Sequence, residues 1–321
     1  MKNFRGVIAL FIVSILLSCD APRLNPLDPL NPDYKLVQID GFVKTVTEPS
    51  KPIAGVKVYW KNQNILVETD AYGYYKIENL PMKDGTMVFE KEGYSSKDTL
   101  ISLPQNQKSK RVDIFLNAIP KLDSLSIYTI VLNRYSVRID SIFVQAQVSD
   151  AEGDVDSVFI RSAELNFYRQ LKFNSSKQFY RSGFSPFDLN LPSIEEGIGK
   201  DFEIVVKDRK KQIFSIGVSN IKRIINQEVL PKSPLNKQIV GTKPTLMWYR
   251  PLLGFNFKYT VQIYTDEIAP VLIWEKQNIP KNDVETVPTI NLIPGDYNWV
   301  VWIIDDYQNR SRSKPASFVV Q

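Results

Sequence analysis

From Leu36 to the C-terminus, apolar and polar residues alternate with a period of two. This is the spacing of strands that bury one face. Turn-forming stretches such as EPSKP and KEGY separate the alternating segments, which include residues 37–43, 55–60, 65–70, 74–80 and 112–117. New strands follow at intervals of roughly 8–12 residues, which is typical of antiparallel sandwiches. The sequence therefore predicts an all-β fold, with one weak helical turn near 193–197.

The amino-terminal segment has the features of an export signal. Lys2 and Arg5 precede an uncharged apolar run, 6–17, that is too short to span a bilayer but suits a secretory signal. The run ends in Leu-Leu-Ser before Cys19, the only cysteine of the chain. This ending resembles the lipobox of bacterial lipoproteins. The resemblance implies cleavage after residue 18 and lipid attachment to Cys19, which would anchor the protein in a membrane.

Residues 19–35 contain prolines at positions 22, 26, 29 and 32. Closely spaced prolines block helix and remove backbone donors, so we expect an extended tether. The Asn-Pro and Asp-Pro pairs resemble those that follow the lipid cysteine in lipoproteins of Bacteroidetes-like bacteria. That resemblance implies a lipid-anchored protein of the bacterial cell envelope, at the outer membrane, with the periplasmic or surface face left open.

Composition excludes several classes of function. The chain has no histidine, so a Ser-His-Asp triad, a Cys-His pair and a His-ligated metal are impossible. The net charge is +5 and the basic runs, 108–111 and 207–211, are short, which argues against nucleic-acid binding. The adjacent carboxylates at 195–196 and 305–306 do not form the separated pair that glycoside hydrolysis needs. We therefore expect no enzyme activity, and no cofactor other than the lipid on Cys19.

The first predicted domain, 36–118, carries motifs in a fixed order: GFV at 41–43, PIAGVKV at 52–58, TDAYGYY at 69–75, LP at 80–81 and KEGY at 91–94. Together they resemble the carboxypeptidase regulatory-like domain, a transthyretin-like sandwich of seven strands. The resemblance implies a structural or accessory module without catalytic residues.

Within this domain, the turns and strands explain why particular residues stand where they do. Gly55 and Gly73 can supply turn dihedrals that a Cβ disfavours. Asp70 can close a turn through its side chain. The alternation also predicts that Tyr75 and Ile77 point into the sandwich.

The second predicted domain, 119–226, alternates over 141–150 and 155–162, with a later hairpin at 201–208 and 212–218. It resembles an immunoglobulin-like or cadherin-like repeat, chiefly through VSDAEGDV at 148–155. Carboxylates, which calcium prefers, are dense here, at Asp150, Glu152, Asp154 and Asp156. An EF-hand would need glutamate where Arg161 stands, so that motif is absent. The alternative, which the sequence favours, is a hairpin turn with solvated acidic residues and no metal.

The third predicted domain, 227–321, resembles the fibronectin type III fold. The residues that carry the resemblance are Pro231, Ser233-Pro234, Trp248, the alternating strand 259–263 and the strand 295–303. We expect Trp248 to lie in the core and 305–320 to form the last hairpin. The predicted architecture is thus three tandem β-sandwiches behind a cleaved lipoprotein signal (1–18) and a proline-rich tether (19–35).

Two functions remain open. The first is a non-catalytic lipoprotein that presents sandwich modules to a protein partner in the envelope, or serves in adhesion. The alternative is a carbohydrate-binding lipoprotein accessory to a glycan uptake system. For the alternative, Trp60 is the best candidate platform because amides at 61–64 follow it, with Trp274 and Trp302 as further candidates. The sequence favours a shielding role for Trp60 over ligand binding.

Overall fold

The structure is a computed structural model that describes residues 36–103 and 108–321. The predicted signal peptide, Cys19 and the tether lie outside the described residues. The described chain is nearly all β, and its helical segments are three short 3-10 turns: η2 (Lys61–Gln63), η3 (Phe187–Leu189) and η4 (Ile194–Gly197). The all-β prediction is confirmed, and η4 coincides with the predicted helical turn at 193–197. The chain divides into two compact units, with the boundary in the sequence between Ile119 and Pro120.

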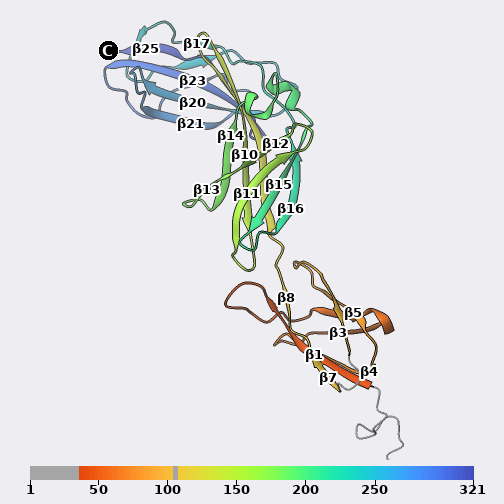
Figure 1. The fold of residues 1–321 in the computed structure, drawn as a ribbon. Helices are drawn as coiled ribbons and strands as arrows, with labels where there is room; N and C mark the ends of the chain where they lie inside the picture. The colour runs from red at the N-terminus through yellow and green to blue at the C-terminus, as the bar shows by residue number, and fades with distance from the viewer. Residues whose placement is uncertain (1–35, 104–107) are drawn as a thin grey trace, which may run out of the picture. The chain divides into compact units, whose positions relative to one another are not determined.

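The first unit is a sandwich of two sheets (Figure 1). In one sheet a central strand pairs antiparallel with β4 and parallel with β7 and β8; the strands are β1 (Leu36–Thr45), β4 (Tyr74–Pro81), β7 (Ser109–Arg111) and β8 (Ile114–Leu116). The other sheet has the order β3 (Ile65–Glu68), β2 (Lys57–Trp60), β5 (Gly85–Glu90) and β6 (Lys97–Ile101). One hydrophobic core between 37 and 116 fills the space between them.

The expected turns of the first unit are present. Gly55 and Gly73 have φ of +64° and +74°, in the left-handed region that disfavours a Cβ. The Asp70 carboxylate accepts hydrogen bonds from the backbone N–H groups of residues 72 and 74, at 2.8 and 2.9 Å. Tyr75 and Ile77 are 1% and 2% exposed, so the predicted inward face of β4 is confirmed.

The second unit is built on a ten-stranded sheet. Its main path has the order β13 (Lys172–Asn174), β14 (Phe179–Phe184), β10 (Arg138–Ser149), β9 (Lys121–Asn133), β24 (Arg310–Arg312), β23 (Gly295–Asp305), β20 (Phe257–Thr265) and β21 (Leu272–Pro280). Off this path, β25 (Ala316–Val320) pairs with β23 and with β18 (Gln238–Val240).

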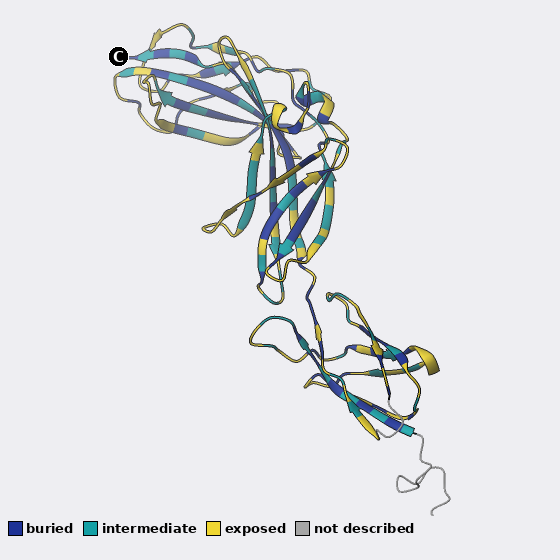
Figure 2. Ribbon diagram, in the orientation of Figure 1, coloured by how far each residue is buried: buried dark blue, intermediate teal, exposed yellow. Residues whose placement is uncertain are grey.

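Two smaller sheets contribute to two separate hydrophobic cores in this unit (Figures 1 and 2). The first is β12 (Phe167–Gln170), β11 (Val155–Ser162), β15 (Asp201–Asp208) and β16 (Ile213–Asn220). The second is β17 (Pro231–Ser233), β19 (Leu246–Trp248) and β22 (Glu285–Thr286). One core lies between residues 127 and 224, and the other, which includes the expected Trp248, between 225 and 320.

The ten-stranded sheet is continuous across both cores because β24 pairs in parallel with β9. The predicted hairpin at 305–320 is therefore wrong in detail. β24 pairs with β23 on one side and β9 on the other, whereas β25 pairs with the other end of β23. The physical reason is that both edges of β24 are already paired, one with β23 of one sandwich and the other with β9 of the other sandwich.

The acidic segment after β10 is also not a hairpin turn. β10 belongs to the ten-stranded sheet and β11 to the smaller sheet opposite it, so residues 150–154 cross between two layers. The later hairpin is present, since β15 and β16 pair antiparallel.

Candidate ligand-binding groove

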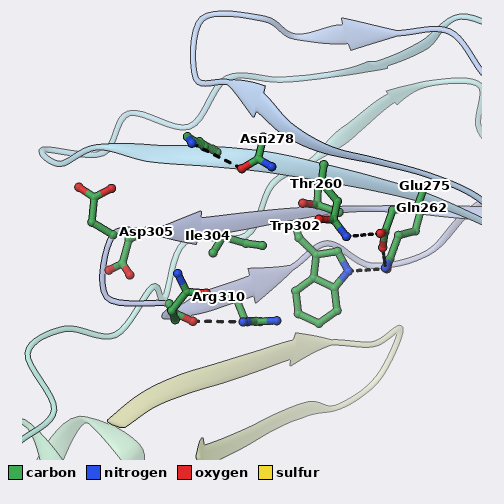
Figure 3. A pocket seen from close by; sticks show the side chains of 12 residues that line it. Thr260, Gln262, Glu275, Asn278, Trp302, Ile304, Asp305 and Arg310 are labelled. Carbon is green, nitrogen blue, oxygen red and sulfur yellow. Dashed lines mark hydrogen bonds between the residues drawn. The ribbon is translucent and has the colours of Figure 1, made fainter. Parts of the chain in front are cut away.

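A groove of about 430 Å³ lies on the outward face of β20, β21, β23 and β24, and is called here the tryptophan groove (Figure 3). It forms because side chains on one side of these strands point away from the core. On β23, Trp299, Val301 and Ile303 are fully buried, whereas Trp302 and Ile304 face outward and are half-buried. The residues used below are Lys258, Gln262, Glu275, Asn278, Trp302 and Arg310.

The indole of Trp302 is held by a hydrogen-bond chain. Its Nε1 donates to Oε1 of Gln262 at 2.7 Å, and the Tyr264 hydroxyl donates to the same oxygen at 2.9 Å. The amide nitrogen of Gln262 donates in turn to the carboxylate of Glu275, which also accepts from Gln277. Because the ring nitrogen and the amide are both engaged, the ring orientation is set before any ligand arrives.

The opposite end of the groove carries carboxylates. Asp305 is buried, and its Oδ1 accepts the backbone N–H groups of Tyr307 and Asn309, both at 2.9 Å. Its Oδ2 accepts from Asn309 Nδ2 at 3.1 Å and lies 3.4 Å from the guanidinium of Arg223. Asp306, by contrast, is exposed. Asp305 therefore stabilises the β23–β24 turn, and the adjacent carboxylates have different environments.

A ligand in this groove would meet the ring of Trp302, amides and a few charges. Lys258 Nζ lies 3.5 Å from Asn278 Oδ1, so both line the same wall. Amides, hydroxyls and one aromatic ring are groups that recognise polar organic ligands, with the ring giving contact area and the amides giving orientation. The arrangement is suited to binding, and no nucleophile–base pair lies among the groups described above.

Trp60, the best candidate platform, is not an exposed stacking surface, in agreement with the shielding role that the sequence favoured. It is 1% exposed and packs in the core of the first unit. Its ring occupies the space where a Cβ at Gly85 would lie, at 2.3 Å. The neighbouring amides act structurally: Asn62 Oδ1 accepts from Thr86 N at 3.1 Å, and Asn64, with φ of +55°, accepts from the Tyr59 hydroxyl.

The other two tryptophans differ from each other. Trp274 is 6% exposed and its Nε1 donates to Thr289 Oγ1 at 3.0 Å, so it too belongs to a core. Trp302 faces the groove. Sequence reasoning named Trp302 without ranking it first, and it missed Gln262 and Glu275. The signal in the sequence was alternation: residues 260, 262 and 264 fall on the side of the strand opposite to the apolar residues 259, 261 and 263.

The four candidate calcium ligands do not converge on one point. Asp150 Oδ1 accepts the backbone N–H groups of Glu152 and Gly153 at 2.7 and 2.8 Å, and Asp156 accepts from the Ser157 hydroxyl. Within residues 36–103 and 108–321, no group of three or more acidic, cysteine or histidine side chains has a metal-binding arrangement. Calcium binding by residues 150–156 stays a prediction that has not been tested.

Asp154 is the unusual member of this segment. It is 3% exposed, and its Oδ2 has no hydrogen-bond partner among the described residues. Burial raises the pKa of Asp154 to about 6, and the negative charges of Asp150, Asp208 and Glu152 add to the effect. The solvated acidic turn expected from the sequence therefore contains one buried carboxyl group.

Comparison with known proteins assigns the first unit. Residues 39–124 match the family model of the CarboxypepD_reg-like domain, which confirms the resemblance seen in the sequence motifs. This match covers well under half of the chain. A search of curated protein sequences finds no match.

Three of the solved structures that resemble the chain share 10–12% sequence identity with it. The TIE protein of Bacillus anthracis has a TM-score of 0.29 over 89% of this chain and 49% of its own, so the chain spans about half of that protein. The fibronectin(III)-like modules of Clostridium thermocellum CbhA give 0.31 over 63% and 93%. A DUF3823 family protein from Bacteroides ovatus gives 0.26 over 58% and 98%.

The described residues contain no helix that is both long enough and apolar enough to cross a membrane.

Proposed function

We propose that the protein is a non-catalytic lipoprotein of the bacterial envelope that presents β-sandwich modules to a protein partner. The observation that carries this proposal is the edge of the ten-stranded sheet. Among the described strands, β21 pairs with β20 alone, which leaves its other side without a neighbour. Just before it, Ile268 is fully exposed and Val271 is 54% exposed, and Leu272, its first residue, is 46% exposed.

An unpaired edge next to exposed apolar side chains is a template for strand addition. Backbone hydrogen bonds from the added strand supply affinity, and side chains such as Leu272 supply apolar contact. Long exposed edges normally carry charge or are covered, since they otherwise promote association. The apolar run at 268–273 is thus suited to a partner that contributes an extended segment.

The test is affinity capture of the tagged, lipidated protein from envelopes of its own source. A photo-crosslinking residue at position 268 would report direct contact. We expect one or two membrane proteins in fixed proportion, crosslinked at 268 and lost in Leu272→Lys. Ile213→Lys is the matched control, because Ile213 is 64% exposed on β16, an edge strand of a different sheet. Recovery of the same proteins by the Leu272→Lys variant, or no recovery at all, would contradict the proposal.

Anchoring is tested separately. If Cys19 carries the lipid, Cys19→Ser should move the protein from the membrane fraction to the soluble fraction. A variant that stays with the membrane would show that another segment holds it there.

Carbohydrate binding is the second candidate, and the tryptophan groove favours it. Trp302 offers a ring whose orientation is set by Gln262, beside amides that can bond hydroxyl groups. Trp302→Ala should abolish retention in glycan affinity gels, whereas Trp60→Phe, a conservative change in the core, should not alter it. Retention that survives Trp302→Ala would exclude this groove as the site.

A further inference from the structure

The outward face of the ten-stranded sheet carries three arginines where the two sandwiches join. β24 contributes Arg310 and Arg312, two positions apart, and β14 contributes Arg181. Register places them on one side of the sheet, because Arg310 and Arg312 lie opposite Ile130 and Leu132, and Ser311 between them is buried. These three residues, with Tyr128, are called the arginine face.

Each guanidinium of the arginine face packs on an aromatic ring. Arg181 lies 4.6 Å from the ring centre of Phe143 and donates to the Tyr128 hydroxyl at 2.8 Å. Arg310 lies 5.3 Å from the ring centre of Tyr128, and Arg312 lies 5.8 Å from that of Trp302. The rings position the cations but leave their charge uncompensated.

No carboxylate offsets these charges within the described part of the chain. None of the ion pairs found there involves Arg181, Arg310 or Arg312. Two aspartates lie on strands β9, β10, β14 and β24, and both have other partners: Asp123, at the bulge of β9, accepts from the Ser149 hydroxyl, and Asp140 pairs with Arg138. The Nε atoms of Arg181 and Arg312 are also buried without a hydrogen-bond partner among the described residues.

The electrostatic environment of these arginines favours binding of an anion. Burial lowers the pKa of Arg310, and the nearby charge of Arg181 lowers it further. Burial likewise lowers the pKa of Arg312, with Arg134 as the second cause. Half-buried cations that repel one another are costly unless an anion pairs with them. Packing on aromatic rings returns only part of that cost.

We propose that the arginine face binds the carboxylate groups of an acidic polysaccharide whose sugar rings lie in the adjoining tryptophan groove. Arg312 and Trp302 are direct cross-strand neighbours on β24 and β23, so a charged site and a stacking ring are adjacent. Figure 3 shows Arg310 on the strand next to Trp302, lining the same groove. Arginine binds planar carboxylates through two parallel hydrogen bonds, which suits a uronic acid.

Other features of the groove fit the same ligand. The carboxylate of Asp305 is compensated by Arg223, and that of Glu275 by two amides, so neither is free to compete for the arginines. Asn278 lines the groove with an amide that can bond a hydroxyl group of a sugar, whereas the amide of Gln262 holds Trp302 in place. An acidic peptide would use the arginines but would have no need of a ring bordered by amides. This inference rests on the carbohydrate-binding candidate described above.

The test measures binding of the mature full-length chain to oligogalacturonate, with neutral dextran and polyglutamate as comparison ligands, by isothermal titration calorimetry. Arg310→Gln with Arg312→Gln should weaken oligogalacturonate binding by about tenfold or more, because two charged hydrogen-bonding groups are lost. High salt should weaken wild-type binding in the same direction. Arg161→Gln is the matched control, since Arg161 pairs with Glu203 on the other sheet.

The possible results separate the two proposals. Equal affinity for dextran and oligogalacturonate, unchanged in the double variant, would overturn the acidic ligand and retain carbohydrate binding. No binding of either glycan would overturn both. Arginine-dependent binding of polyglutamate alone would replace the glycan by an acidic polypeptide and overturn the proposal. If the double variant does not fold, Arg310→Lys serves instead, because it keeps the charge and removes the paired hydrogen bonds.

Discussion

The two compact units differ in how their sheets are shared between hydrophobic cores. The first unit has two four-stranded sheets around one core, and each of its sheets is made only from residues between 36 and 116. The second unit has two cores but one continuous sheet, because β24 pairs with β9 about 180 residues earlier in the chain. The self-contained sandwich buries Trp60 in its core, whereas the sheet shared by two sandwiches has a broad outward face to which side chains of both contribute.

This difference is reflected in the exposure of two tryptophans. Trp60 and Trp302 both stand on strands and both looked like candidate platforms. In the first unit Trp60 lies opposite Met87, and Gly85, two residues before Met87, leaves the space that the buried ring fills. In the second unit, Trp302 lies on the outward side of β23 beside arginines that the pairing of β24 with β9 brings together. The groove and the arginines proposed as a ligand site therefore lie where the two sandwiches share a sheet.

The largest expected effect is on the self-contained unit. Trp60→Ala should destabilise the first unit by about 3–5 kcal/mol, because it removes a fully buried ring from a packed core. Differential scanning calorimetry of the full chain should show the transition of the first unit at lower temperature while that of the second is unchanged. A simultaneous shift of both transitions would contradict their independence.

The next test breaks the shared sheet. Asn309 is 1% exposed, and its Oδ1 accepts from the backbone N–H and the hydroxyl of Thr129 at 2.8 and 3.1 Å. Asn309→Ala should destabilise the second unit by about 2–4 kcal/mol, because it leaves buried donors without an acceptor. Faster amide hydrogen exchange in both β9 and β24 would check this. The exposed Asn256→Ala is the control, and exchange confined to β24 would contradict coupling of the two cores.

The third prediction concerns pH in the second unit. The folded-state pKa of Asp154, about 6, lies above its ordinary value of 3.8, so folding disfavours the charged form. The second unit should therefore gain stability as pH falls from neutral through the pKa of Asp154. Asp154→Asn should stabilise it at neutral pH by about 1–3 kcal/mol and remove this dependence. Denaturant unfolding across pH measures both, and an unchanged profile in the variant would assign the dependence to another group.

The fourth prediction contrasts the outward tryptophan with the buried one. Trp302→Ala should cost less than about 2 kcal/mol, because the ring is already half-buried and outside the core. Its effect on glycan retention should be far larger than its effect on unfolding. A stability loss equal to that of Trp60→Ala would show that Trp302 is a core residue in solution.

The smallest expected effect is that of calcium. Asp150 already accepts backbone hydrogen bonds, and no cluster of metal ligands lies among the described residues. Calcium added to the full chain should leave the unfolding of the second unit unchanged, with EDTA-treated protein as the control. A rise in its unfolding temperature would establish a site at 150–156.

The sequence by itself determined the strands and much of the first unit. Alternation predicted the inward face of β4, and the glycine and aspartate positions predicted its turns, because both signals depend on neighbouring residues along the chain. The carboxypeptidase regulatory-like motifs likewise identified the first unit. The short turn at η4 and the burial of Trp248 were also within reach of local pattern.

Only the tertiary structure decided which strands meet and what faces outward where they meet. A strand of three residues, β24, carries no local signal that it will pair with β9, since pairing depends on edges that exist only after both sandwiches fold. For the same reason the sequence could not tell that the acidic segment crosses between sheets, or that Arg181 joins Arg310 and Arg312. Alternation sets which side of a strand a residue occupies, and long-range packing sets whether that side meets a core or a ligand.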